Sequence, residues 1–368
     1  RKTKMNDIYS IDSHKLIFHP TRVSKWLESQ NNWDKQKEIY PIYVEISPYG
    51  GCNHRCTFCG LDYMGYDKKS LNYDVLKNTL TNMAENGVKS VMFAGEGEPL
   101  LFKDLDIIVE HCSKVGIDTS LTTNFVPLNK KNIEKCMENC SWIKVSLNAG
   151  TAKTYSEIHR TSEKDFERVM SNLAYANEYR KNNKLNCTLG VQMLLLPENK
   201  DEAVVLAQKC KEIGVDYLVI KPYSQHLYSE TTKYENIDYS KMLDIKENLD
   251  KINDDNFNVI FRINTIKKYI EKKQPYEKCY STPFFWGYIS ANGDVYGCSA
   301  HLSDEKFCYG NIYNNSFKEI WESEKRRKSL LFVENELDIK DCRVNCRMDE
   351  INRYLWRLKN PHLHENFI

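Results

Sequence analysis

Long hydrophobic runs are absent from this sequence of 368 residues, and no window approaches the roughly 18 consecutive apolar residues that a membrane-spanning helix needs. An excess of charge of one sign is also absent, because the formal net charge is only +1. We therefore expect neither a membrane nor a nucleic acid as partner. The sequence also lacks internal repeats and low-complexity tracts, which excludes solenoid and disordered architectures.

An apolar leader is missing as well, since the sequence begins with the polar, basic stretch RKTKMNDIYS. This start favours a cytoplasmic location. The 13 cysteines form an odd number, which fits a reducing compartment better than a set of disulfides. A chain of this length buries a large core without disulfides, so the cysteines need another explanation.

Short runs of β-branched and aromatic residues alternate with longer amphipathic segments, a pattern typical of βα units and a parallel sheet. Six such repeats predict an α/β fold with a partial (β/α)6 barrel followed by a small C-terminal domain. The predicted strands are 43–47, 90–94, 118–123, 142–147, 187–194 and 217–221, and helices are predicted at 73–86, 105–115, 163–184 and 200–213.

Four regions follow from this pattern. We expect an N-terminal capping segment at 1–40, the partial barrel at 41–228, a linker with a helix and an extra strand at 229–274, and a second domain at 275–368. The extra strand is predicted at 258–263. The second domain is predicted to start where the composition becomes rich in cysteine, glycine and aromatic residues.

Three cysteines follow the first predicted strand on a glycine-flanked loop, with the spacing C-x3-C-x2-C at Cys52, Cys56 and Cys59. Thiolate sulfur is the ligand type that iron–sulfur clusters require, and three thiols leave one corner of a four-iron cube open. Active sites of barrels gather at the carboxyl ends of the strands. The alternative is a zinc knuckle with Cys56 and Cys59 as one ligand pair.

More thiols lie near the C-terminus, at Cys279, Cys298, Cys342 and Cys346. Four thiolates from separate segments are good ligands for an iron–sulfur cluster and also for zinc. Cys308 lies between them and has three possible roles: a buried structural thiol, which we favour, a ligand in place of Cys342, or a hydrogen-atom donor to a substrate radical.

The first cysteine motif, together with Gly95-Glu96-Gly97-Glu98-Pro99 after the second strand, resembles the radical S-adenosylmethionine (SAM) superfamily. The resemblance implies a catalytic 4Fe-4S cluster whose open iron is chelated by SAM. One electron then cleaves SAM to methionine and a 5′-deoxyadenosyl radical. The predicted SAM-binding residues on this basis are Phe58, Gly97, Glu98, Thr123, Ser146, Asn148, Arg160 and Gln192.

The C-terminal pattern is similar to the SPASM/Twitch extensions of the same superfamily, with Gly310-Asn311-Ile312 and Phe317-Lys318-Glu319-Ile320-Trp321 as the usual sequel. A full SPASM domain has seven cysteines for two auxiliary clusters, whereas only five cysteines lie beyond residue 270 here. The resemblance therefore implies one auxiliary 4Fe-4S cluster, held by Cys279, Cys298, Cys342 and Cys346.

These features predict a radical SAM oxidoreductase that oxidises a carbinol of a sugar, nucleotide sugar or aminocyclitol, with the auxiliary cluster as electron acceptor. The alternatives are a sugar epimerase with Cys308 as hydrogen donor, radical modification of a ribosomal peptide, and a zinc-stabilised binding module without enzyme activity. A flavodoxin- or ferredoxin-type protein is the expected electron donor. The candidate substrate-facing residues are Lys221, Tyr223, Gln225, His226, Arg262 and Tyr288.

Overall fold

A computed structural model describes residues 9–127, 129–271, 273–282 and 284–367. The helices are α1 Pro20–Glu28, α2 Trp33–Gln36, α3 Tyr73–Glu85, α4 Leu105–Lys114, α5 Lys130–Asn139, α6 Ala152–His159, α7 Glu163–Asn182, α8 Ala203–Ile213, α9 Ile245–Asp250, α10 Ile263–Glu271, α11 Phe317–Trp321, α12 Glu324–Asn335 and α13 Asp349–Lys359. The strands are β1 Tyr43–Ile46, β2 Ser90–Phe93, β3 Asp118–Thr123, β4 Cys140–Ser146, β5 Thr188–Leu195, β6 Tyr217–Pro222, β7 Asn258–Phe261, β8 Trp286–Ile289, β9 Asp294–Tyr296 and β10 Cys308–Asn311.

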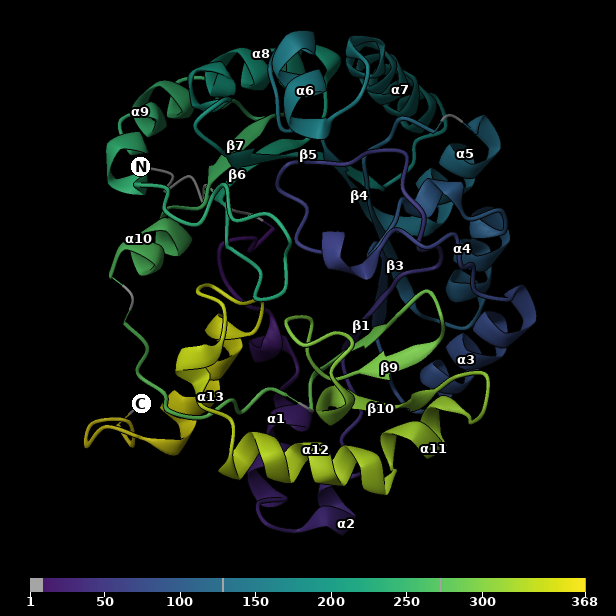
Figure 1. Ribbon diagram of the computed structural model, residues 1–368, viewed down its shortest axis with the longest axis vertical. Coiled ribbons are helices and arrows are strands. Elements are labelled where there is room, and N and C mark those ends of the chain that lie inside the picture. The colour runs from purple at the N-terminus through teal and green to yellow at the C-terminus, as the bar shows by residue number, and fades with distance from the viewer. Residues whose placement is uncertain (1–8, 128, 272, 283, 368) are drawn as a thin grey trace.

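All ten strands belong to one curved sheet in the order β10-β9-β8-β1-β2-β3-β4-β5-β6-β7. Strands β1 to β7 pair in parallel with their sequence neighbours, and the helices α3 to α9 lie outside them in an open ring (Figure 1). This arrangement confirms the predicted α/β fold with a partial barrel and a small C-terminal domain.

Side chains along the barrel strands alternate between two environments. In β4, Ile143 and Val145 are fully buried in the core beneath the helices, whereas Lys144 and Ser146, which alternate with them, are only half-buried. Successive side chains of a strand point to opposite faces, so the second pair faces the inside of the barrel. The inner face of the barrel is therefore partly polar and accessible.

The predicted linker contains β7 and α10, and β7 extends the parallel sheet beyond the six predicted repeats. The extra strand predicted at 258–263 is therefore confirmed and ends at Phe261. Ahead of β7, helix in the linker is confined to the single turn 239–242 and α9.

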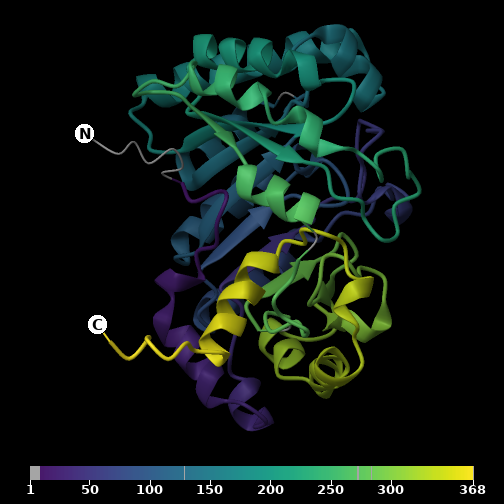
Figure 2. The same cartoon turned by 90° about the vertical axis from the view of Figure 1, so that its left-hand side faces the viewer.

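The C-terminal domain joins the barrel through backbone pairing, because β8 runs parallel to β1. β9 and β10 then continue the sheet as antiparallel strands. The domain lies beside the lower half of the barrel, with α1 of the N-terminal segment on the other side of α13 (Figure 2). Trp26 of α1 packs with Phe285 and Leu355 in a small core that joins the two ends of the chain.

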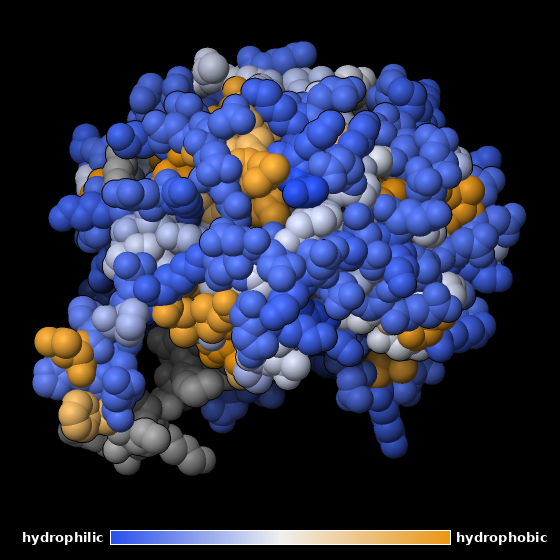
Figure 3. Space-filling view, turned by 90° about the horizontal axis from the view of Figure 1, so that it is seen from below, coloured by the Kyte–Doolittle hydropathy of each residue, from blue (hydrophilic) through white to orange (hydrophobic). Residues whose placement is uncertain are grey.

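The barrel strands and helices that were predicted differ from the structure at their ends. β4 starts two residues earlier than predicted, at Cys140, and α7 ends two residues earlier, at Asn182. The helix predicted at 200–213 consists of a 3-10 turn over Lys200–Glu202 followed by α8. In the described ranges, no helix has the length and apolar character needed to cross a bilayer. The face seen from below is mostly hydrophilic, with apolar residues in small groups (Figure 3).

Candidate active site at the barrel mouth

The three-cysteine loop follows β1 at the carboxyl end of the barrel strands, and the three thiols are partly accessible. Burial, together with the nearby carboxylate of Glu98, raises the pKa of the Cys52 thiol to about 12. Burial and the two neighbouring thiols also raise the pKa of Cys56 well above its usual value. Three adjacent thiolates in such a place need a compensating cation, which a metal cluster provides. The donor set therefore fits an iron–sulfur cluster.

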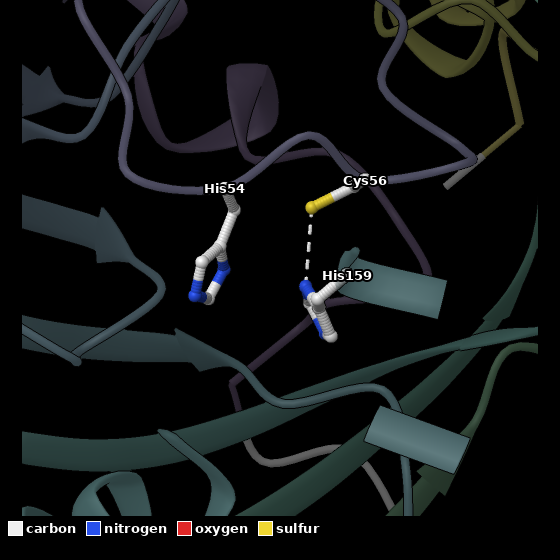
Figure 4. Close-up of side chains that lie close together, drawn as sticks. All are labelled: His54, Cys56 and His159. Atoms are coloured by element: carbon white, nitrogen blue, oxygen red, sulfur yellow. Dashed lines mark hydrogen bonds between the residues drawn. The ribbon is translucent and has the colours of Figure 1, made fainter. Parts of the chain in front are cut away.

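His159, at the end of α6, reaches into the same loop. Its Nδ1 lies 3.1 Å from the Cys56 sulfur, and its Nε2 lies 3.0 Å from the carbonyl oxygen of Leu147 (Figure 4). His54 is nearby on the loop, and ligand atoms of His54, Cys56 and His159 lie within 4.8 Å of one another. Burial and His54 lower the pKa of His159 to about 3, so its imidazole is neutral.

The segment Gly95–Pro99 packs directly against the cysteine loop. The backbone N–H of Glu98 donates to the Gly51 carbonyl at 2.9 Å. A Cβ on Gly97 would lie 2.2 Å from the same oxygen and 2.5 Å from that of Tyr49, so only glycine fits there. This close approach fixes the two motifs relative to each other.

The Glu98 carboxylate is 2 % exposed and accepts three hydrogen bonds, from Thr123 Oγ1 and from the backbone N–H groups of Leu100 and Asn124. A carboxylate has about four acceptor positions, so one remains for an ammonium group. The Thr123 hydroxyl, which was predicted to contact SAM, donates a hydrogen bond to Glu98 and accepts one from the Phe125 N–H.

Three predicted SAM-binding residues come together at the ends of β4 and β5. Ser146 is the register partner of Gln192, and the Gln192 carbonyl accepts from the N–H groups of Leu147 and Asn148. The Asn148 amide donates to the Ser146 hydroxyl at 3.0 Å and accepts from the Leu194 N–H at 2.8 Å. The side chain of Asn148 is fully buried, so its main role is to hold these strand ends together.

Phe58 contacts His159, and Arg160 follows His159 in the chain. The Phe58 ring packs edge-on against the His159 ring, with centroids 5.3 Å apart. Arg160 is the residue that follows α6, has a left-handed backbone with φ of 50°, and is exposed. It makes no hydrogen bond or ion pair within the described ranges. The structure therefore brings His159, rather than the predicted Arg160, into the site.

The four C-terminal thiols of Cys279, Cys298, Cys342 and Cys346 line a single cavity. The pKa values of Cys342 and Cys346 are raised to about 12, mainly by burial, and the neighbouring Cys279 thiol raises both further. Distant segments thus supply four mutually close thiols, and this donor set fits an auxiliary cluster.

Cys308 lies elsewhere. It is the first residue of β10, and its side chain lines a surface groove together with Asp294, Glu305 and Lys325. The groove shares no lining residue with the four-thiol cavity. This position does not support Cys308 as a ligand in place of Cys342.

His226 connects the two cysteine sets. Its Cβ lies 3.4 Å from the position that a side chain on Gly60, next to Cys59, would occupy. Its Nε2 lies 3.1 Å from the carbonyl oxygen of Ser299, the neighbour of Cys298. One histidine therefore separates the two cysteine-bearing loops.

Glu96 and Tyr63 also belong to this region and were not predicted from the sequence. Glu96 Oε1 accepts from the Ala291 N–H at 3.2 Å and from the Tyr288 hydroxyl at 3.4 Å, which joins the barrel to the C-terminal domain. Burial raises the pKa of Glu96 to about 7. The Tyr63 ring stacks on that of His226 at 5.3 Å. In the sequence, only their positions near the two motifs pointed to the site. Glu96 lies within the glycine motif, and Tyr63 lies shortly after the third cysteine.

The remaining candidates lie around the inside of the barrel. Lys221 lies on the inner side of β6, and Tyr223 follows two residues later in the loop after this strand. Arg262 pairs with Asp12 of the N-terminal segment at 3.2 Å. Tyr223 is buried, and its ring packs against Tyr234 at 5.5 Å. Gln225 donates to the Thr231 carbonyl at 2.8 Å, which ties its amide to the loop.

Comparisons with known proteins agree with this geometry. The radical SAM superfamily model matches residues 46–210, and the model of the iron–sulfur cluster-binding SPASM domain matches residues 279–347. A GTP 3′,8-cyclase of Limosilactobacillus fermentum is 30 % identical over 215 residues, which are 56 % of this chain and 62 % of that protein. A GTP 3′,8-cyclase of Aquifex aeolicus is 26 % identical over 78 % of this chain and 91 % of its own length.

Among solved structures, Streptococcus suis SuiB bound to SAM has a TM-score of 0.63 and 20 % sequence identity, over 87 % of this chain and 75 % of SuiB. SuiB bound to its precursor peptide SuiA has the same TM-score, 0.63, with 19 % identity over 84 % of this chain and 69 % of SuiB. At this identity the likeness concerns the fold.

The second family match begins at Cys279 and ends one residue after Cys346, so it spans the four thiols that line one cavity. The first match contains the cysteine loop and Gly95–Pro99. These domains imply SAM, a catalytic 4Fe-4S cluster and auxiliary iron–sulfur binding as the cofactors. The chain is a member of the radical SAM superfamily with a C-terminal SPASM iron–sulfur domain.

Proposed function

We propose that the chain is a radical SAM oxidoreductase that dehydrogenates a carbinol carbon of a sugar, nucleotide sugar or aminocyclitol. When bound, SAM and the catalytic cluster supply a 5′-deoxyadenosyl radical that takes a hydrogen atom, and the auxiliary cluster supplies an acceptor for one electron. The substrate loses one hydrogen atom from carbon, one proton from its hydroxyl group and one electron. Its C–O single bond then becomes a carbonyl.

One observation carries this proposal: the contact of His226 with both cysteine-bearing loops. Its Cβ approaches Gly60 beside Cys59, and its Nε2 lies 3.1 Å from the oxygen of Ser299 beside Cys298. Only one layer of side chains separates the catalytic loop from the auxiliary one, so an electron has a short route out of a substrate held at the barrel mouth. This arrangement supports net oxidation.

Glu96 is suited to accept the proton. Its carboxylate lies at the junction of barrel and C-terminal domain, where both described hydrogen bonds go to Oε1 and leave Oε2 available. A general base works best when its pKa lies near the working pH, and burial brings that of Glu96 to about 7. In this proposal Glu96 takes the hydroxyl proton as the carbonyl forms.

The alternatives have less support. An epimerase needs a hydrogen donor beside the substrate, and Cys308 lines a surface groove on β10 instead. The relatives named above act on GTP or, for SuiB, bind a precursor peptide, so cyclisation and peptide modification define the other outcomes to test. A flavodoxin- or ferredoxin-type protein is the proposed electron donor.

The test is anaerobic reconstitution followed by incubation with SAM and dithionite. We expect brown protein with roughly eight irons per chain and 5′-deoxyadenosine as product. C56A should abolish 5′-deoxyadenosine formation, whereas C112A, a thiol buried in the core beneath the helices, should retain it. A colourless protein that releases no 5′-deoxyadenosine contradicts the proposal and favours the zinc-stabilised binding module.

The reaction type is tested by product mass with candidate nucleotide sugars and peptides. Dehydrogenation lowers the mass by roughly two units, since two hydrogens leave. An unchanged mass with solvent deuterium on carbon identifies an epimerase and rules out net oxidation.

A further inference from the structure

Two lysines face the inside of the barrel. Lys144 lies between Ile143 and Val145, which are fully buried beneath the helices, and Lys221 follows Ile220, which is buried in the same layer. Because strand side chains alternate, both lysines point the other way, toward the barrel interior. Both are half-buried, so the interior around them is accessible.

Other cations surround them. The positive neighbours of Lys221 are Lys144, Arg262, Arg343 and Arg347, of which the two last come from the loop between Cys342 and α13. Together these five side chains form what we call the barrel cation cluster. It brings together residues from β4, β6, the end of β7 and the C-terminal domain.

Acidic partners are too few to neutralise the cluster. Arg347 pairs with Glu45, and Arg262 pairs with Asp12. Arg343 donates instead to the backbone oxygen of Ser224 at 2.8 Å. Neither lysine makes an ion pair or hydrogen bond with any residue the structure describes, and the Lys144 ammonium lies 5.2 Å from the centre of the Trp142 ring.

Uncompensated cations inside a protein are costly. Burial and the neighbouring cations lower the pKa of Lys144 to about 8, and they also lower the pKa of Lys221 well below its usual value. An anion between the two ammonium groups would remove this cost. The cluster has three more cations than acidic partners, so a group with two or more negative charges matches it better than a single carboxylate.

We propose that the substrate is a phosphorylated small molecule whose phosphate groups bind between Lys144 and Lys221, with Arg343 beside them. This inference rests on the proposed function, which makes the barrel interior the substrate chamber. Among the proposed substrates it favours a nucleotide sugar or sugar phosphate over a cationic aminocyclitol. Lysines bind phosphate as point charges, and the arginine fork adds directed hydrogen bonds.

The position of the lysines gives the substrate an orientation. Lys144 lies two residues before Ser146 on β4, which is about 7 Å toward the amino end of the strand. Phosphate held there would leave the sugar pointing toward the cysteine loop, where hydrogen abstraction takes place.

A cavity borders the cluster at the amino end of the barrel. A cavity of about 650 Å³ opens there, and Tyr43, Trp142, Arg262 and Arg347 are among its lining residues. This volume is in the usual range for small-molecule sites. Arg262 and Arg347 of the cluster line this cavity, whereas Lys144 and Lys221 are not among its lining residues.

Binding of inorganic pyrophosphate to the reconstituted, SAM-loaded enzyme, measured by anaerobic calorimetry, tests the proposal. We expect K144Q and K221Q each to weaken binding by about tenfold or more, because each removes one charged contact. K164Q, an exposed lysine on α7, should leave the affinity unchanged. Iron content and absorbance spectra show whether the variants are folded and loaded.

Succinate provides the second arm. Weak or undetectable binding of succinate is expected; lysine-dependent binding of succinate without binding of pyrophosphate would overturn the phosphate assignment in favour of a carboxylate. Equal pyrophosphate affinity in wild type, K144Q and K221Q would also overturn it. Formation of 5′-deoxyadenosine by the wild-type enzyme is scored separately, so loss of the proposed function and loss of the phosphate site are distinguishable.

Discussion

At the scale of single residues, the two glutamates of the Gly95–Pro99 segment have different surroundings. Glu98 accepts hydrogen bonds from three internal donors, whereas Glu96 accepts two, both on one oxygen. Burial raises the pKa of each to about 7. Glu98 therefore links neighbouring strand ends, and the Oε2 atom of Glu96 is left available for the proton transfer proposed above.

We expect both carboxyl groups to be protonated below about pH 7 and ionised above it, since burial disfavours the charged form. Infrared difference spectra between pH 5.5 and 8.5, roughly 1.5 units either side of that midpoint, should show loss of protonated carboxyl absorption as pH rises. E96Q should remove part of this signal, and E110Q, on the surface of α4, should not. Ionisation of Glu96 complete below pH 5 would contradict its role as base.

Gly97 is the second informative residue. A methyl group there would meet the backbone oxygens of Gly51 and Tyr49 at 2.2 and 2.5 Å, so G97A must push the cysteine loop away. We expect a loss of stability of about 1–3 kcal/mol and lower iron content at the catalytic site. In G287A the nearest atom lies at 3.4 Å, and iron content should be unchanged. Normal iron content and SAM binding in G97A would contradict this expectation and show that the cysteine loop accommodates the added methyl group.

At the scale of elements, the C-terminal segments that carry Cys342 and Cys308 can be tested separately as ligands of the auxiliary cluster by measuring iron content. Cys342 lines the four-thiol cavity, and Cys308 lines a different groove on β10. We expect C342A to lower iron from roughly eight to roughly four per chain, because one four-iron cluster is lost. C308A should retain the full iron content. The reverse result would make Cys308 the ligand.

The strands and helices of the barrel were predictable because hydrophobic alternation and helical periodicity are local properties of the sequence. The grouping of seven thiols into an N-terminal and a C-terminal set was predictable because their spacing is visible along the chain, and their role as cluster ligands stays a prediction. His159, Glu96 and Tyr63 were not, since only the fold brings α6, the glycine motif and the loop after Cys59 to one place. Arg160 was predicted instead of the adjacent His159. The sequence does not show which of two neighbouring residues at a helix end has its side chain directed inward.

At the scale of the whole molecule, the backbone of the barrel and that of the C-terminal domain form one sheet, because β8 pairs with β1. Sequence could not predict this pairing, since it joins strands more than 200 residues apart. Side chains add to the connection: Trp321 of α11 donates to the Ile39 carbonyl at 2.8 Å. We infer that barrel and C-terminal domain unfold together.

Arg326 tests this inference because it lies where three parts of the chain meet. Its side chain is fully buried and donates to the backbone oxygens of Trp321, Gln36 and Ile39. R326M removes these buried hydrogen bonds to three backbone oxygens, at a cost on the order of 3 kcal/mol. Since the sheet is continuous, we expect urea unfolding to remain a single transition, shifted to lower urea in both tyrosine fluorescence and far-ultraviolet circular dichroism.

R327M is the matched control, because Arg327 is the next residue of α12, has a side chain that is 47 % exposed and makes only a surface pair with Glu324. Surface pairs of this kind contribute about 0–1 kcal/mol, so its midpoint should hardly move. If R326M instead splits the curve into two transitions and moves only one of them, the C-terminal domain unfolds on its own. The β1–β8 pairing would then be too weak to couple the two halves, and the clusters would respond to denaturant separately.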